Sequence, residues 1–311
     1  MINSKKVTFE FSNMRLDKVS AEMFRDFSRT QIKKWILEGR ILLNNELASP
    51  KDNVCINDVI EINPITEKKI SWEPEDIYFD VINEEKDYLI INKPSNLIMH
   101  PGAGCKNGTL ANGLLYRYPE LENISRSGIV HRLDKDTSGI LLVARTEKFR
   151  NYFVNELQER KVKKNYNAVV VGKLLGSLEI NDPIGRDKNN RTKMSIRSDG
   201  KEAYSFIKPQ ENFNNYSLLN ISIKTGRTHQ IRVHLASKKL PIIGDRTYNS
   251  SGKIAKDTPE ELIKVIRDFP RQALHSRKLS FANPDTQESI SFNAPLDKDM
   301  QNLIVNLKKH I

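Results

Sequence analysis

The segment from Gly128 to Gly139, GIVHRLDKDTSG, constrains the structure of this chain more than any other. It places Asp134 between two cations, Arg132 and Lys135, in a polar loop. The apolar run at residues 140–144 follows at once and predicts a buried strand, because short unbroken apolar runs are typical of strands covered on both faces. A carboxylate held at a strand end among basic neighbours is a candidate reactive group. A loop aspartate in a structural ion pair is the alternative.

The distribution of charge indicates a polyanionic partner. The chain has 50 Lys and Arg against 39 Asp and Glu, a net charge of +11. Residues 1–75 hold 12 of each sign, so the whole excess lies in residues 76–311. Nucleic acid is the usual partner of such a domain. One dense basic cluster predicts a track for phosphates, with an ordinary solvated surface as the alternative; it comprises Arg186, Lys188, Arg191, Lys193, Arg197 and Lys201.

Several classes of protein are disfavoured by the sequence. No apolar run is long enough to span a membrane, and the first residues lack the apolar core of a secretory signal. The two cysteines, Cys55 and Cys105, lie far apart and outside any metal-binding spacing. The glycine-rich loop at residues 100–108 fits neither common phosphate-loop pattern. We therefore expect a cytoplasmic monomer with no membrane contact, no metal site and no nucleotide or other cofactor.

Residues 1–75 predict a small module followed by a linker. A helix begins at a capping-box pair, presents one apolar face and ends at Gly39. The residues behind this prediction are Ser28, Gln31, Ile32, Trp35 and Ile36. A strand and a turn are predicted at residues 41–45, and a second strand at residues 58–62. The segment resembles an S4 domain, a small RNA-binding fold, although Asn57 stands where that pattern usually has glycine.

Residues 76–311 predict a second, larger domain of the α+β class. Strands outnumber helices and rarely alternate with them, so a mixed, mostly antiparallel sheet flanked by helices is expected. Thr146 can cap a helix that runs to about residue 159, and a second helix is expected from Arg227 to about residue 237. The predicted strands are residues 88–92, 140–144, 166–171, 203–207, 218–223 and 274–281.

The loop around Asp134 resembles the signature of the RluA/RluD family of pseudouridine synthases. The segment His131–Gly139 carries this resemblance, and residues 100–104 favour the RluD branch. Further segments resemble the same family in the same order, so that the likeness extends over nearly the whole chain. They are residues 164–172, 224–236, 241–245, 271–275 and 294–295.

The resemblance implies a role for particular residues. Asp134 corresponds to the catalytic aspartate, which would either attack C1′ of the uridine or remove the C2′ proton. Tyr166 corresponds to the active-site tyrosine. We expect Arg227 to be the arginine that pairs with Asp134, and Arg132 to enter the gap that a flipped-out uridine leaves in the RNA. His131 is expected to shape the loop.

Two other enzyme classes fit the residues less well. A hydrolase would need a carboxylate pair, but Asp134 and Asp136 sit two apart in one loop. A metal site could enlist His229 and His234, but their i, i+5 spacing puts them off a common helix face. A non-catalytic rRNA-binding assembly factor is the alternative from a different class.

The sequence thus predicts a pseudouridine synthase acting on large-subunit (23S) ribosomal RNA or its precursor particle. Another RluA-type specificity, for other rRNA sites or for tRNA, is the alternative within the class. The S4-like domain is assigned to residues 1–75 and the catalytic domain to residues 76–311. The residues expected to contact RNA are Arg132, His131, Arg29, Lys33, Lys34, Arg186, Lys188, Arg191, Lys193, His229 and Arg232.

Overall fold

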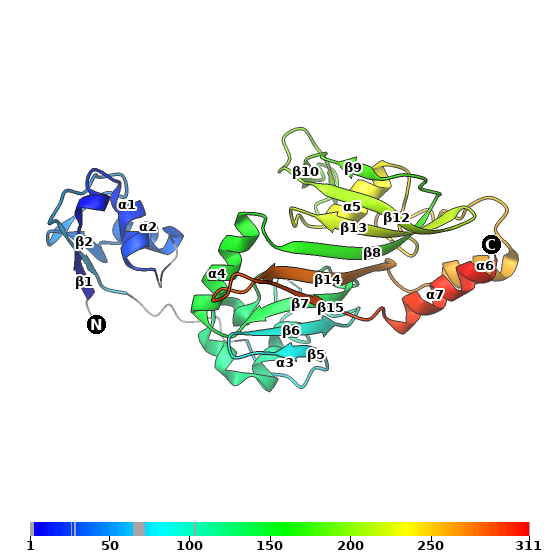
Figure 1. Cartoon of the computed structure of the whole chain (residues 1–311), viewed down its shortest axis with the longest axis horizontal. Helices are drawn as coiled ribbons and strands as arrows, with labels where there is room; N and C mark the ends of the chain where they lie inside the picture. The colour runs from blue at the N-terminus through cyan, green and yellow to red at the C-terminus, as the bar shows by residue number, and fades with distance from the viewer. Residues whose placement is uncertain (1–2, 26, 28, 65–71, 103, 311) are drawn as a thin grey trace. The chain divides into compact units, whose positions relative to one another are not determined.

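The chain divides into two compact units, Met1–Lys69 and Ile70–Ile311 (Figure 1). The computed structural model describes residues 3–25, 27, 29–64, 72–102 and 104–310. The division falls a few residues before the boundary expected from the sequence at residue 75. Ser28, the first residue of the expected capping box, lies outside the described residues.

The first unit is a small antiparallel sheet packed against two helices. Its strands lie in the order β1-β4-β2-β3. Helix α2 buries Ile32, Trp35 and Ile36, as its apolar spacing predicts. The helix is followed by Gly39 with φ +70°, a left-handed conformation that glycine adopts without steric cost. The elements are β1 (Asn3–Lys6), α1 (Leu16–Met23), α2 (Arg29–Leu37), β2 (Ile41–Leu43), β3 (Glu46–Leu47) and β4 (Val59–Ile62).

Asn57 replaces glycine without breaking the turn before β4. Its φ of +71° is left-handed, and asparagine is one of the few side chains that tolerate this region. Asp58 then closes the turn by accepting hydrogen bonds from the backbone N–H of Cys55 and from the side chain of Asn44. The departure from the usual pattern is therefore structurally neutral.

The second unit is built on one large mixed sheet. Its strands lie in the order β5-β6-β7-β14-β8-β13-β12-β9, with β15 paired to β14. The β7–β14 pair is parallel, and the other pairs in the sheet are antiparallel. The strands are β5 (Asp80–Glu84), β6 (Tyr88–Lys93), β7 (Ser138–Ala144), β8 (Lys163–Val171), β9 (Leu178–Ile180), β12 (Ser205–Phe213), β13 (Tyr216–Ile223), β14 (Leu274–Ala282) and β15 (Ser289–Asn293).

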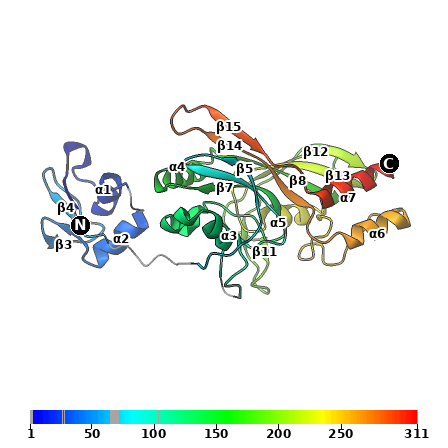
Figure 2. The ribbon, with the colours of Figure 1, turned by 90° about the horizontal axis from the view of Figure 1, so that it is seen from below.

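Helices cover both faces of the sheet near β7. Leu141 and Val143 of β7 belong to the larger core, on the face where Figure 2 shows α3 and α5. Ile140 and Leu142 point the other way and pack against α4. The α+β fold with a mixed, mostly antiparallel sheet is therefore confirmed. The helices are α3 (Leu110–Arg117), α4 (Glu147–Gln158), α5 (Gln230–Ser237), α6 (Glu260–Asp268) and α7 (Lys298–Lys309).

Two local details of this unit position the site. Thr146 caps α4 as predicted, since its hydroxyl accepts a hydrogen bond from the backbone N–H of Phe149 at 3.2 Å. Helix α5 begins three residues later than predicted, because residues before it form a turn in which His229 takes a left-handed φ of +57°. A short hairpin of β10 (Ile184–Arg186) and β11 (Met194–Ile196) stands beside α5 and carries Arg186, Lys188, Arg191 and Lys193 of the basic cluster.

Candidate active site

A cleft collects the main candidate residues of the second unit. It is formed by the loop before β7, the middle of β8 and the residues leading into α5. Asp134, Tyr166 and Arg227 all line it, together with Arg132 and His229. Its empty space is about 450 Å³, counting the open mouth. Residues more than ninety positions apart in the chain therefore converge on one concave surface, the usual setting of a small reactive site.

Asp134 sits at the head of a tight turn and is held by a cation. Its carbonyl accepts a hydrogen bond from the backbone N–H of Thr137 at 3.1 Å, which closes a four-residue turn just before β7. Its carboxylate oxygen Oδ2 accepts a hydrogen bond from Nη1 of Arg232 at 3.0 Å. The side chain is 16% exposed, so it remains reachable from the cleft.

Arg232 is itself fixed by a second carboxylate. Its Nε and Nη2 donate to the two oxygens of Asp245 at 2.8 and 2.9 Å, a two-pronged geometry that sets the plane of the guanidinium. Asp245 also accepts backbone hydrogen bonds from Thr247 and Tyr248. Burial opposes the charge on Arg232, but the hydrogen bonds and charges of Asp245 and Asp134 raise its pKa. The guanidinium is therefore charged and rigidly aimed at Asp134.

The expected pairing of Arg227 with Asp134 is wrong. Arg227 lines the cleft, but its Nε donates to the backbone oxygen of Glu202 at 2.9 Å, and Arg232 occupies the position next to Asp134. The reason is the late start of α5: Arg227 lies in the turn before the helix, whereas Arg232 projects from its first turns. Arg232, expected to contact RNA, is instead buried. The acidic residue that marks Arg232 as the partner of Asp134 is Asp245. It lies in the segment 241–245, which the sequence analysis had related to the family.

Tyr166 forms a wall of the cleft. Its side chain is buried, and its strand position lies directly across from Ser276 on β14. Burial, with a smaller contribution from the charge of Asp134, raises the pKa of Tyr166 to about 12. The phenol is therefore protonated at neutral pH, where its oxygen can both donate and accept a hydrogen bond.

His229 and Tyr248 connect the cleft to the basic hairpin. Nδ1 of His229 lies 2.8 Å from the Tyr248 hydroxyl, which also accepts a hydrogen bond from the backbone N–H of Met194 on β11. Nε2 of His229 lies 4.0 Å from Oδ2 of Asp134. Burial lowers the pKa of His229 despite the nearby carboxylate. His229 is thus a cleft residue beside Asp134 as well as an expected RNA contact.

The two residues before Leu133 differ in their surroundings. Nε2 of His131 accepts a hydrogen bond from the backbone N–H of Leu142 at 2.9 Å, and burial lowers the pKa of His131 to about 3. The ring is therefore neutral and supports the loop against β7, and its contact with RNA stays a prediction. Arg132, by contrast, is exposed at the mouth of the cleft.

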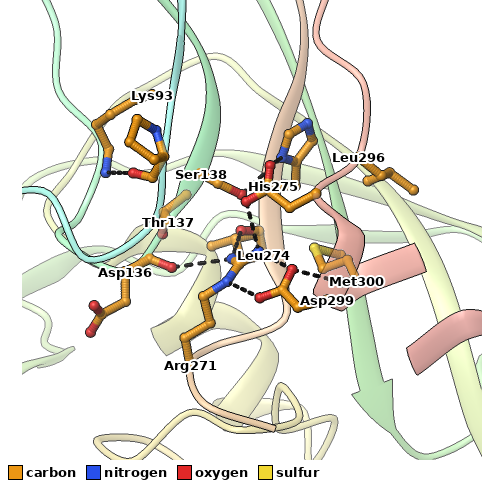
Figure 3. Close-up of polar contacts among 12 residues, drawn as sticks. Lys93, Asp136, Thr137, Ser138, Arg271, Leu274, His275, Leu296, Asp299 and Met300 are labelled. Atoms are coloured by element: carbon orange, nitrogen blue, oxygen red, sulfur yellow. Dashed lines mark hydrogen bonds and ion pairs between the residues drawn. The ribbon is translucent and has the colours of Figure 1, made fainter. Parts of the chain in front are cut away.

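Two buried basic side chains hold the carbonyls that follow Asp134, and no local pattern in the sequence indicates either contact. The ammonium of Lys93 donates to the carbonyls of Leu97 and Lys135, both at 3.0 Å. Arg271 donates to the carbonyl of Asp136 at 3.3 Å. Figure 3 shows Arg271 between Asp136 and Asp299, the latter an ion-pair partner at 2.6 Å. The turn that carries Asp134 is therefore held by hydrogen bonds from Lys93 and from Arg271.

The remaining expected RNA contacts lie on exposed surfaces. On the basic hairpin, Arg186, Lys188 and Arg191 are exposed and Lys193 is half-buried. In the first unit, Arg29 forms an ion pair with Asp17 at 3.1 Å, and Lys34 lies 3.9 Å from Glu38. Lys33 is exposed on the same helix. Their contacts with RNA stay a prediction.

Comparisons with known proteins identify the family. Residues 87–237 match the RNA pseudouridylate synthase family, and residues 14–60 match the S4 domain. The chain is 40% identical over 95% of its length to a Vibrio cholerae protein named ribosomal large subunit pseudouridine synthase D, covering 91% of that protein. The chain belongs to the RNA pseudouridylate synthase family.

Further relatives of this pseudouridine synthase also bear the names of pseudouridine synthases. A protein of the same name from Escherichia coli K12 is 40% identical, with 93% of this chain and 89% of that protein covered. The solved structure named human RNA pseudouridylate synthase domain containing 1 has a TM-score of 0.54 at 26% identity, covering 74% of this chain and 95% of that one. The expected enzyme class, RNA pseudouridine synthase, is therefore confirmed, as is the S4 domain.

Two features are absent from the described residues of the synthase. None of its helices is long and apolar enough to cross a membrane. Within the same residues, no group of three or more His, Cys, Asp and Glu side chains is arranged to hold a metal ion.

Proposed function

We propose that this synthase converts specific uridines of large-subunit (23S) ribosomal RNA to pseudouridine, with Asp134 as the reacting carboxylate. One observation carries the assignment of Asp134: its carboxylate is aimed by Arg232 in an open cleft whose wall is Tyr166. The names of the related proteins support ribosomal RNA as the substrate. The absence of a cofactor, a monomeric state and a cytoplasmic location complete the proposal.

The chemistry requires a carboxylate facing a sugar that gains positive charge as its bond to the base breaks. Arg232 and His229 both approach Oδ2 of Asp134, at 3.0 and 4.0 Å. We therefore assign Oδ1 to the uridine, where it attacks C1′ or takes the C2′ proton. The charge of Arg232 stabilises the carboxylate when the product leaves and resets the site for the next uridine.

Tyr166 and Arg132 serve the base rather than the sugar. A buried aromatic ring at the cleft wall offers a flat surface for the freed uracil, and its protonated phenol can assist the transfer of the C5 proton. A base inside a stem must leave the stack before Asp134 can reach its sugar, at a cost of about a few kcal/mol. Arg132, exposed at the mouth, is the side chain that we assign to the vacated position in the RNA.

Two surfaces supply affinity for the rest of the RNA. The basic hairpin at residues 184–196 is joined to the cleft through Tyr248 and His229, so phosphates bound there lie near the reacting uridine. The S4 domain has no net charge over residues 1–75, which favours an assisting role in binding.

Mapping of pseudouridines at nucleotide resolution tests the proposal. Ribosomal RNA and tRNA would be compared from cells with the protein, without it, and with an Asp134→Asn variant. We expect specific large-subunit positions to lose pseudouridine in the last two cases. Loss confined to tRNA would favour the alternative specificity. Unchanged pseudouridine with impaired ribosome assembly would favour a non-catalytic assembly factor; the intact Asp134, Tyr166 and Arg232 argue against that reading.

A further inference from the structure

A second, larger groove of the catalytic unit lies beside the cleft. It is bounded by the segment after α4, the start of β8 and the neighbouring parts of β12 and β13, and its empty space is about 1200 Å³ with the open side included. Ile223 lines both the groove and the cleft, so the two are contiguous. A row of cross-strand neighbours forms its floor: Asn165, Ser222, Phe206 and Glu179.

The groove is rich in cations that the protein does not neutralise. Two of its basic residues are paired with carboxylates, Arg160 with Glu202 and Lys161 with Glu159. The other three have no carboxylate within ion-pair distance among the residues that the structure describes. They are Lys163, Lys164 and Lys224. An open surface with unpaired cations and one lining carboxylate, Glu179, complements a polyanion.

Lys164 stands at the junction of groove and cleft. It is only 8% exposed, and a Cβ at position 226 would lie 3.5 Å from its Nζ. Gly226 and Arg227 line the cleft, so this ammonium separates the two hollows. Burial, reinforced by the charge of Arg227, lowers the pKa of Lys164 to about 8. A cation kept this dry beside another cation is destabilised unless an anion from outside approaches it.

Aromatic rings complete the groove. Phe206 on β12 and Tyr204 just before this strand are half-buried, and Nζ of Lys224 lies 4.3 Å from the centre of the Tyr204 ring. Aromatic faces alternating with lysines are the pattern by which proteins bind single-stranded RNA, since bases stack on the rings and phosphates meet the cations. A double helix would present its phosphates but keep its bases out of reach of Phe206.

We propose that this groove binds single-stranded nucleotides adjoining the target uridine, with a phosphate at Lys164 and Lys224 and a base against Phe206. The strand then passes Lys164 on its way into the cleft. This inference rests on the proposed function, because it assumes that the cleft receives a uridine of RNA. It adds that the enzyme binds a short unpaired segment next to the target uridine as part of its substrate.

The test compares two RNAs with the full-length protein. Both contain the same stem-loop with a target uridine, and one carries an unpaired extension of about six nucleotides, placed on the 5′ or the 3′ side in separate versions. Dissociation constants and pseudouridine formation are measured for the wild type, Phe206→Ala and Lys224→Ala. Lys264→Ala on α6 is the matched control, because it removes an exposed lysine outside the groove.

We expect one extension to tighten wild-type binding by about 5- to 150-fold, the range for stacking of one base on an aromatic ring. Phe206→Ala should abolish most of that gain, while the trimmed RNA is modified at the wild-type rate. Lys224→Ala should reduce the gain and lower the salt dependence of binding by about 0.7 in log–log slope. Lys264→Ala should behave as wild type.

Two results would overturn the groove assignment: equal wild-type affinity for extended and trimmed RNA, or a wild-type gain retained in both groove variants. Lys224 is exposed, so its variant tests the assignment even if Phe206→Ala folds poorly. Failure of the proposed function is distinguishable, since it would appear as no pseudouridine in any RNA with the wild type.

Discussion

Arg232 holds Asp134 through one arm of its guanidinium, with Nη1 3.0 Å from Oδ2, while its other nitrogens are committed to Asp245. Asp134, the candidate catalytic residue, is therefore positioned by an arginine whose own orientation is fixed. Asp245 is buried and also accepts two backbone hydrogen bonds, so its own position is fixed. The segment after α5 therefore sets, through Arg232, the orientation of Asp134 in the loop before β7. Geometry of this kind holds a reacting group within the tolerance that catalysis requires.

Replacing Arg232 should damage both stability and turnover. Arg232→Ala leaves Asp245 buried without its partner, a loss of about 3–5 kcal/mol in the free energy of unfolding. Arg232→Lys keeps a charge but cannot serve both carboxylates in the same plane, so kcat should fall with a smaller loss of stability. Single-turnover kinetics and urea unfolding measure the two effects. Arg227→Ala is the control: equal loss of kcat in Arg227→Ala and Arg232→Lys would contradict the assignment.

Asp134→Asn should remove the isomerase activity and spare RNA binding. An amide cannot attack C1′ or accept the C2′ proton, so the rate of pseudouridine formation should fall by about 10⁴-fold or more. The substitution preserves volume and lies in an accessible cleft, which leaves the RNA-binding surfaces intact. Tritium release from labelled RNA gives the rate, and filter binding gives the affinity. An Asp134→Asn variant that forms pseudouridine at the wild-type rate would exclude Asp134 from the mechanism.

Tyr166→Phe separates the two roles of this side chain. The ring remains as a surface for uracil, so affinity should change little, while loss of the phenol should lower kcat by about 10²–10⁴-fold. Because burial raises the pKa of Tyr166 to about 12, ionisation of the phenol should not reduce wild-type kcat below about pH 10. A variant with unchanged kcat would restrict Tyr166 to packing.

Much of the fold near the site could be predicted from local sequence. The apolar run after the signature loop becomes β7, and the Thr146 cap starts α4 where expected. Such features depend on residues within a few positions of one another, and propensity and capping act over that range. That Asp134 and Tyr166 lie in one cleft could be predicted from the family resemblance, but not from the spacing of the two residues.

The contacts that the sequence could not supply are long-range. Arg227 and Arg232 sit in one segment, and only the start of α5 decides which one faces Asp134. Lys93 reads as part of a strand end before a proline, yet it reaches the carbonyl of Lys135, 42 positions away. Tertiary packing fixes both outcomes, and no local preference distinguishes one arginine or lysine from the next.

The buried ammonium of Lys93 should make stability depend on pH. Burial lowers its pKa from the usual 10.5 to about 7, so above pH 7 the unfolded chain binds a proton that the folded chain has released. Stability from this group is therefore lost as pH falls toward 7 and recovered as pH rises toward 10.5. Between about pH 8 and 9 the wild type should gain about 1 kcal/mol in the free energy of unfolding relative to Lys93→Met.

Urea unfolding at several pH values measures this difference. Lys86→Met is the matched control, because Lys86 is exposed just before β6 and its replacement should leave the pH dependence of the wild type unchanged. Parallel curves for the wild type and Lys93→Met would mean that Lys93 titrates in the folded protein as it does in the unfolded chain. That result would contradict a dry amino group whose hydrogen-bond partners, among the residues that the structure describes, are the carbonyls of Pro94, Leu97 and Lys135.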